Sequence, residues 1–134
     1  MTFVMFSRND NIRKSSLFTP WSFIHFLSGI ISYLYLKRFT SMSETCIFLI
    51  LLLIHTLYEI KDLSRYTLKL HKSNSIWYNN TVVNSIGDTI TFILGIVIGM
   101  IFKNNIINLS NSNITNISLL YLCIILIYIK FQLG

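Results

Sequence analysis

The feature that most constrains this chain is a series of four long apolar stretches separated by polar or basic segments. They cover residues 20–36, 43–60, 82–102 and 117–131, within a residue or two. A helix needs roughly 20 residues, within a range of about 17–25, to cross the hydrocarbon core of a bilayer. The third stretch reaches this length, and the second and fourth lie near its lower end. The sequence therefore predicts an all-α fold, an integral membrane bundle of four transmembrane helices.

Composition supports a chain solvated by lipid. Hydrophobic residues make up 53% of the 134 residues and charged residues only 12%, about half the charged share of a soluble domain. The net charge is +6, but the basic residues lie between the apolar stretches, which is typical of membrane anchoring, so we expect no nucleic-acid partner. The chain has no alanine and many Ile and Asn residues, which indicates an AT-rich genome, as found in large DNA viruses, parasites and some bacteria.

Local signals divide the chain into an N-terminal arm, residues 1–19, and a four-helix transmembrane domain, residues 20–134. Thr19 followed by Pro20 predicts a helix start, because a hydroxyl residue caps the helix and proline fits its first turn. Lys37 and Arg38 close the first helix and can reach the membrane interface. The Asn-, Ser- and Thr-rich residues 104–116 predict a polar loop.

The distribution of Lys and Arg predicts the orientation. With four spans, one side of the membrane holds eight basic residues and the other holds three, so the positive-inside rule places both termini and the middle loop in the cytosol. The middle loop, residues 61–81, mixes basic residues with Trp and Tyr, which favours a position among anionic lipid headgroups. His71 in this loop is expected to be solvated. The eight residues are Arg8, Arg13, Lys14, Lys61, Arg65, Lys69, Lys72 and Lys130, and the three are Lys37, Arg38 and Lys103.

Polar residues whose exposure to lipid would be energetically unfavourable lie on one face, and at one depth, of three predicted helices. His25 lies five residues into the first helix, about 8 Å deep at the usual rise per residue. In the second helix His55 and Glu59 are spaced i, i+4, with Asp62 one further turn along, and in the third helix Asn84 and Asp88 have the same i, i+4 spacing, so each set shares a face. Because such side chains avoid lipid, we expect them to converge near the cytosolic side. The predicted polar cluster comprises His25, His55, Glu59, Asp62, Asn84 and Asp88.

Three interpretations of the polar cluster stay open at this point. It is a hydrogen-bond network that joins three helices, a metal or acid–base site, or a pocket for a lipid headgroup. In the second case the ligands of a divalent metal ion such as zinc or iron would be His25, His55, Glu59 and Asp88. The sequence thus predicts a small polytopic membrane protein that binds a metal ion or a headgroup, and leaves open whether it is an enzyme. The alternative is a non-enzymatic structural component, for example of a viral membrane, which recruits partners through the basic loop.

Two further patterns concern packing. Gly95 and Gly99 form a small-xxx-small pattern, which predicts a close helix crossing inside the bundle or in an oligomer. Cys46 and Cys123 lie inside apolar stretches without a metal-binding spacing, so we expect two buried, unpaired thiols.

These motifs resemble the VanZ-like superfamily of small membrane proteins. The resemblance rests on residues 24–27 (Ile-His-Phe-Leu), on Glu59 in the next helix, and on residues 84–87 (Asn-Ser-Ile-Gly) leading to Gly95 and Gly99. It covers residues 20–100 and implies a bundle of several spans with an intramembrane polar site. The superfamily usually has an Arg and an Asp before the Asn-containing helix, whereas here Asp88 follows Asn84, which indicates a divergent branch.

Overall fold

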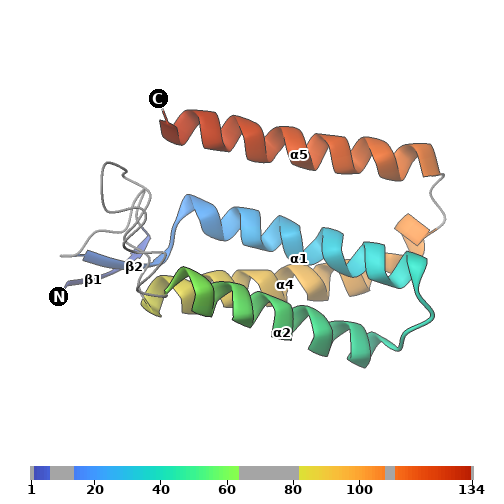
Figure 1. Ribbon diagram of the computed structural model, residues 1–134, viewed down its shortest axis with the longest axis horizontal. Coiled ribbons are helices and arrows are strands. Elements are labelled where there is room, and N and C mark those ends of the chain that lie inside the picture. The colour runs from blue at the N-terminus through green and yellow to red at the C-terminus, as the bar shows by residue number, and fades with distance from the viewer. Residues whose placement is uncertain (1, 7–13, 64–81, 108–110, 134) are drawn as a thin grey trace.

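Four helices dominate the part of the chain that the computed structural model describes, residues 2–6, 14–63, 82–107 and 111–133. They are α1 (Pro20–Phe39), α2 (Glu44–Asp62), α4 (Val82–Ile107) and α5 (Asn111–Leu133). Figure 1 shows them side by side along the long axis of the molecule. The predicted helical fold is confirmed, and each of the four apolar stretches coincides with a helix, the second including Ser43, the residue that caps α2.

The helices differ in how well they could cross a membrane. Among the described helices, α4 alone is long and apolar enough to do so, over Val82–Asn104. The apolar part of α5, Asn113–Ile127, is shorter. Helix α2 carries four charged residues within its 19 positions, and α1 contains a histidine, three serines and two tyrosines among its apolar residues. Length and composition therefore indicate one possible membrane span among the described helices, α4.

The predicted polar loop at residues 104–116 is wrong, because most of it is helical. Helix α4 continues to Ile107, and α5 already begins at Asn111. Asn and Ser are favoured at helix starts because their side chains can accept hydrogen bonds from the first backbone N–H groups. A polar run therefore fits the beginning of a helix as well as a loop. The predicted basic loop beyond residue 63, with His71, lies outside the described residues.

The N-terminal arm contains two short strands that the sequence analysis did not predict. Strands β1 (Thr2–Phe6) and β2 (Lys14–Phe18) pair in parallel, with Thr2 opposite Lys14. They lie at the end of the bundle where α1 begins and α2 ends (Figure 1). Strand β2 packs on α4, where a Cβ atom added to Gly87 would lie 1.7 Å from the carbonyl oxygen of Leu17. Strand β2 is thus seated on the bundle.

Helices α1 and α4 approach each other most closely, at glycines. A Cβ atom on Gly29 of α1 would lie 2.2 Å from the carbonyl oxygen of Phe92, and one on Gly95 of α4 would lie 2.1 Å from that of Phe26. Gly99 faces α1 less tightly, with the nearest atom, Cδ1 of Tyr33, at 3.0 Å. The crossing predicted at Gly95 and Gly99 is therefore made with α1 of the same chain.

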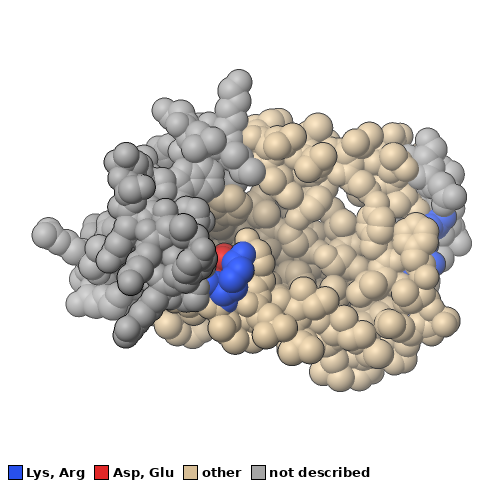
Figure 2. All heavy atoms as spheres, viewed as in Figure 1, with Lys and Arg blue, Asp and Glu red and all other residues tan. Residues whose placement is uncertain are grey.

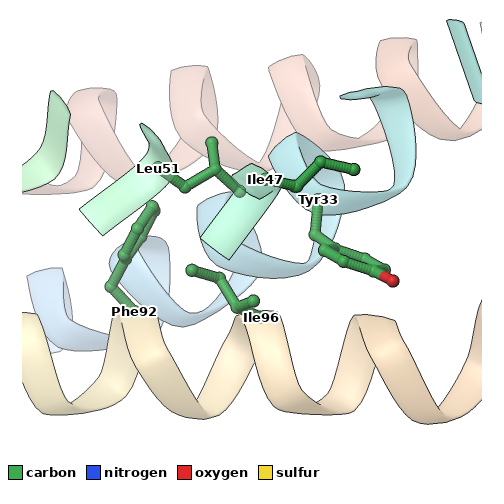
Figure 3. Packing of buried hydrophobic residues seen from close by; sticks show 5 residues of the cluster. All are labelled: Tyr33, Ile47, Leu51, Phe92 and Ile96. Carbon is green, nitrogen blue, oxygen red and sulfur yellow. The ribbon is translucent and has the colours of Figure 1, made fainter. Parts of the chain in front are cut away.

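The apolar core lies between α1, α2 and α4. Figure 3 shows its buried side chains meeting between these helices. Cys46 and Cys123 are free thiols, but both are exposed. The prediction of buried thiols was wrong because both residues lie on outward faces of their helices. The core residues are Tyr33, Ile47, Leu51, Phe92 and Ile96.

Candidate metal centre

Four ionisable side chains from three helices meet inside one end of the bundle. Nε2 of His25 on α1 lies 3.8 Å from Oε1 of Glu59 on α2 and 3.6 Å from Oδ2 of Asp88 on α4. Nε2 of His55, one turn before Glu59, also lies 3.8 Å from Oε1 of Glu59. The structure thus brings together all four residues that the sequence analysis named as metal ligands.

The four side chains are largely shielded from solvent. His55 and Glu59 are each 5% exposed and Asp88 is 3% exposed. The side chain of His25 is the most accessible, at 17%. Burying two carboxylates is costly unless opposite charge or hydrogen bonds compensate. A divalent cation at this position would balance the two negative charges.

His55 is held in place by aromatic contacts and keeps one nitrogen available. Its ring stacks on Phe92 of α4, with centroids 4.2 Å apart and planes 8° apart. The ring of His25 meets it edge-on at 5.1 Å. Nε2 of His55 is buried and makes no hydrogen bond with any residue in the described part of the chain. A buried nitrogen of this kind can serve as a metal ligand without losing an existing bond.

Asp88 is fixed by the first turn of α1. Its Oδ1 accepts a hydrogen bond from the hydroxyl of Ser22. The same Ser22 hydroxyl oxygen accepts the backbone N–H of Thr19, at 3.1 Å. The helix start at Pro20 thus places Ser22 in the first turn of α1, where its hydroxyl orients the Asp88 carboxylate of α4.

Two further residues of the predicted polar cluster contact other side chains. Nδ2 of Asn84 lies 3.5 Å from Oγ1 of Thr19, at the beginning of α1. Asp62 pairs with Lys61 at 3.2 Å, and its side chain is 24% exposed. Asn84 lies one turn closer to the end of the bundle than Asp88, and Asp62 is the last residue of α2. Both residues therefore lie nearer the end of their helix than Asp88 and Glu59 do.

Donor atoms of three residues fit one small metal ion. Ligand atoms of His25, His55 and Glu59, here called the three-ligand set, all lie within 4.8 Å of one another. Tetrahedral zinc with bonds of about 2.1 Å separates its donor atoms by about 3.4 Å. The separations of 3.8 Å from Oε1 of Glu59 to each imidazole nitrogen are a few tenths of an ångström longer than this. Because the whole set extends to 4.8 Å, the donor atoms would have to move closer together to share one ion. Asp88, beside His25, lies next to this set.

Sequence reasoning missed Ser22 and Phe92. Ser22 is the third residue of α1, and a hydroxyl near a helix start is expected to bond locally. Its second contact, with Asp88, depends on how α1 meets α4. Phe92 lies one turn after Asp88, and this i, i+4 spacing was the available signal that it shares the cluster's face.

Comparisons with known proteins return no relative. No protein-family model matches this chain, and no curated protein or solved structure matches it either. The resemblance to the VanZ-like superfamily stays a prediction, so the interpretation of the site depends on its own geometry.

Proposed function

We propose that this chain is a polytopic membrane protein of four spans that binds one divalent metal ion through His25, His55 and Glu59. The observation that carries the proposal is the three-ligand set, whose donor atoms meet within 4.8 Å inside a bundle with an apolar exterior. The two histidines and one glutamate match the ligand preference of zinc. The site lies toward the end of the bundle that the charge distribution assigns to the cytosol.

The polarity of the bundle supports a lipid environment. Its interior holds charged and amide side chains, while many large apolar side chains point outward, the reverse of a soluble domain. Figure 2 shows charged side chains on this face in only two small groups, separated by a wide surface of uncharged residues. Lipid would solvate this surface without cost. Exposed apolar residues include Leu49, Leu53, Ile54 and Leu57 on α2, Ile86, Ile90, Leu94 and Ile101 on α4, and Leu119, Leu120, Leu122 and Leu126 on α5.

A labelling experiment tests whether α2 spans the membrane. Single cysteines replace Ser41, before α2, and Lys61, near its end, in a chain with Cys46→Ser and Cys123→Ser. A membrane-impermeant maleimide added to intact cells should label Ser41→Cys, and Lys61→Cys only after permeabilisation, because the positive-inside rule places Lys61 in the cytosol. Labelling of both positions from the same side would contradict the four-span topology.

Metal analysis of the detergent-purified protein tests the site. We expect about one zinc ion per chain after loading and dialysis, because the three ligands can share one ion. His55→Ala and Glu59→Gln should each lose the bound zinc, since each removes one ligand. Glu44→Gln is the matched control, because Glu44 lies on the same helix and pairs with Lys103. Equal zinc in the wild type and in His55→Ala, or no zinc in either, would refute the site.

A further inference from the structure

Helix α2 is attached to the rest of the bundle by a single narrow stripe. Its buried residues are Ile47, Leu51, His55 and Glu59, each four positions after the last. The first two belong to the apolar core, and the last two belong to the three-ligand set. One half of the stripe is thus apolar and the other half carries ligands.

In a membrane the two halves of this stripe do not contribute equally. Apolar side chains gain little by exchanging lipid for protein, because lipid tails are as apolar as they are. Ile47 and Leu51 therefore favour docking of α2 only through close packing. Helices α1 and α4 do not depend on polar contacts in this way, since their backbones meet at Gly29 and Gly95. The ligand half of the stripe consequently decides whether that end of α2 stays docked.

The opposite end of α2 has attachments of its own. Only residues 40–43 separate it from α1, so the chain itself holds the two helices together there. Nζ of Lys103 on α4 also pairs with Glu44 at the first position of α2. This end of α2 is tied to both neighbours without any contribution from the three-ligand set.

We propose that the metal ion acts as a clamp that docks the ligand end of α2 on the α1–α4 pair. This inference depends on the proposed function, because it assigns a conformational role to the same site. With the ion bound, His55 and Glu59 of α2 are joined to His25 of α1. On release of the ion, α2 pivots about its Glu44 end, and its ligand end moves away. Metal occupancy thereby controls exposure of the buried carboxylates.

Distances between spin labels on α2 and α4 test the clamp in the full-length chain, reconstituted with zinc and then treated with EDTA. The first pair, Ile60→Cys and Ile86→Cys, reports on the ligand end in a background with Cys46→Ser and Cys123→Ser. The second pair, native Cys46 and Ile101→Cys with Cys123→Ser, reports on the Glu44 end. All four positions are exposed. Chelation should lengthen the first distance by about one helical turn, ~5 Å, and leave the second unchanged.

Two substitutions give matched controls. His55→Ala should show the long first distance even with zinc present, because it removes a ligand on α2. Lys103→Met should lengthen the second distance and leave the zinc-dependent change of the first intact. A first distance that stays the same while EDTA removes the bound zinc would overturn the clamp and leave the metal site standing. Equal changes in both pairs would also overturn it, since α2 would then separate without a pivot. A wild type that binds no zinc would overturn the site itself.

Discussion

Helix α1 joins α4 and α5 in two different ways. Against α4 it packs through glycines, so closely that an added Cβ atom on Gly29 or Gly95 would overlap backbone. Against α5 it makes few contacts, and two of them are hydroxyl pairs, Ser28 with Tyr121 and Tyr35 with Ser118. Figure 1 shows α5 as an outer helix alongside α1. Close backbone packing distinguishes the first interface, which also carries the Ser22–Asp88 hydrogen bond, whereas the second has hydroxyl pairs without such packing.

In the membrane environment that we propose, the difference reflects what can stabilise helix contacts in an apolar solvent. Without a hydrophobic driving force, helices associate through close van der Waals packing or through interhelical hydrogen bonds. The α1–α4 interface uses the first, which requires residues without side chains at the crossing. The α1–α5 interface uses the second, which tolerates larger residues but depends on individual donors. Substitutions should therefore act in opposite ways at the two interfaces, with added atoms most harmful at the first and removed atoms at the second.

The largest expected effect is at the glycine crossing. Gly95→Ala should lower the free energy of unfolding by about 2–3 kcal/mol, because its Cβ atom would lie 2.1 Å from the carbonyl oxygen of Phe26. Gly99→Ala should cost less, because its nearest neighbour is a side-chain atom at 3.0 Å. Unfolding in mixed detergent micelles, followed by circular dichroism, measures both.

Helix propensity alone predicts the opposite change in stability for Gly95→Ala. In an exposed helix, replacing Gly by Ala is stabilising by about 1 kcal/mol. Ile98→Leu, next to the crossing but of equal volume, serves as the control and should change stability by less than about 1.5 kcal/mol. A more stable Gly95→Ala protein would mean that α1 and α4 are not in close contact at this position.

The helices could be predicted from the sequence, whereas the faces at which they meet could be predicted only in part. Apolar runs and the Thr19-Pro20 start fixed the existence of α1, because these signals are local. The beginning of α5 was missed, since an Asn- and Ser-rich run suits both a loop and a helix start. Gly95 was recognised from its spacing with Gly99. Its partner Gly29 was not, because the approach of α1 to α4 depends on the rotation of both helices.

The same limit applies to the candidate site. Residues spaced i, i+4, such as His55 and Glu59, share a face by helix geometry alone, so their proximity could be predicted. The individual contacts of the polar residues one turn away are harder to predict. The amide of Asn84 contacts Thr19, and the carboxylate of Asp62 contacts Lys61. Helix length and the position of the helix end decide these cases, and both depend on the assembled bundle.

The smallest expected effect concerns the hydroxyl pair between α1 and α5. Counting the protons of the two hydroxyls shows which of them donates the hydrogen bond. The Ser28 hydroxyl already donates to the carbonyl oxygen of Ile24, at 2.8 Å. It has only one proton, so the Tyr121 hydroxyl must donate to Ser28 Oγ. Tyr121→Phe removes this donor and leaves the bond from Ser28 to Ile24 intact. The expected loss of stability is about 0.6 kcal/mol, the average for such bonds in membrane helices.

Ser28→Ala should cost more than Tyr121→Phe, by about 1 kcal/mol, because it leaves the tyrosine hydroxyl in an apolar interface without its acceptor. The double variant should be no less stable than Ser28→Ala alone, since removing the stranded hydroxyl relieves that penalty. A double-mutant cycle measured by unfolding in micelles gives the coupling energy between the two residues. If the two single changes were additive, the hydroxyl pair would contribute nothing to holding α5 on α1. The helix would then be retained by its covalent link to α4 and by lipid, and the contrast between the two interfaces of α1 would be greater still.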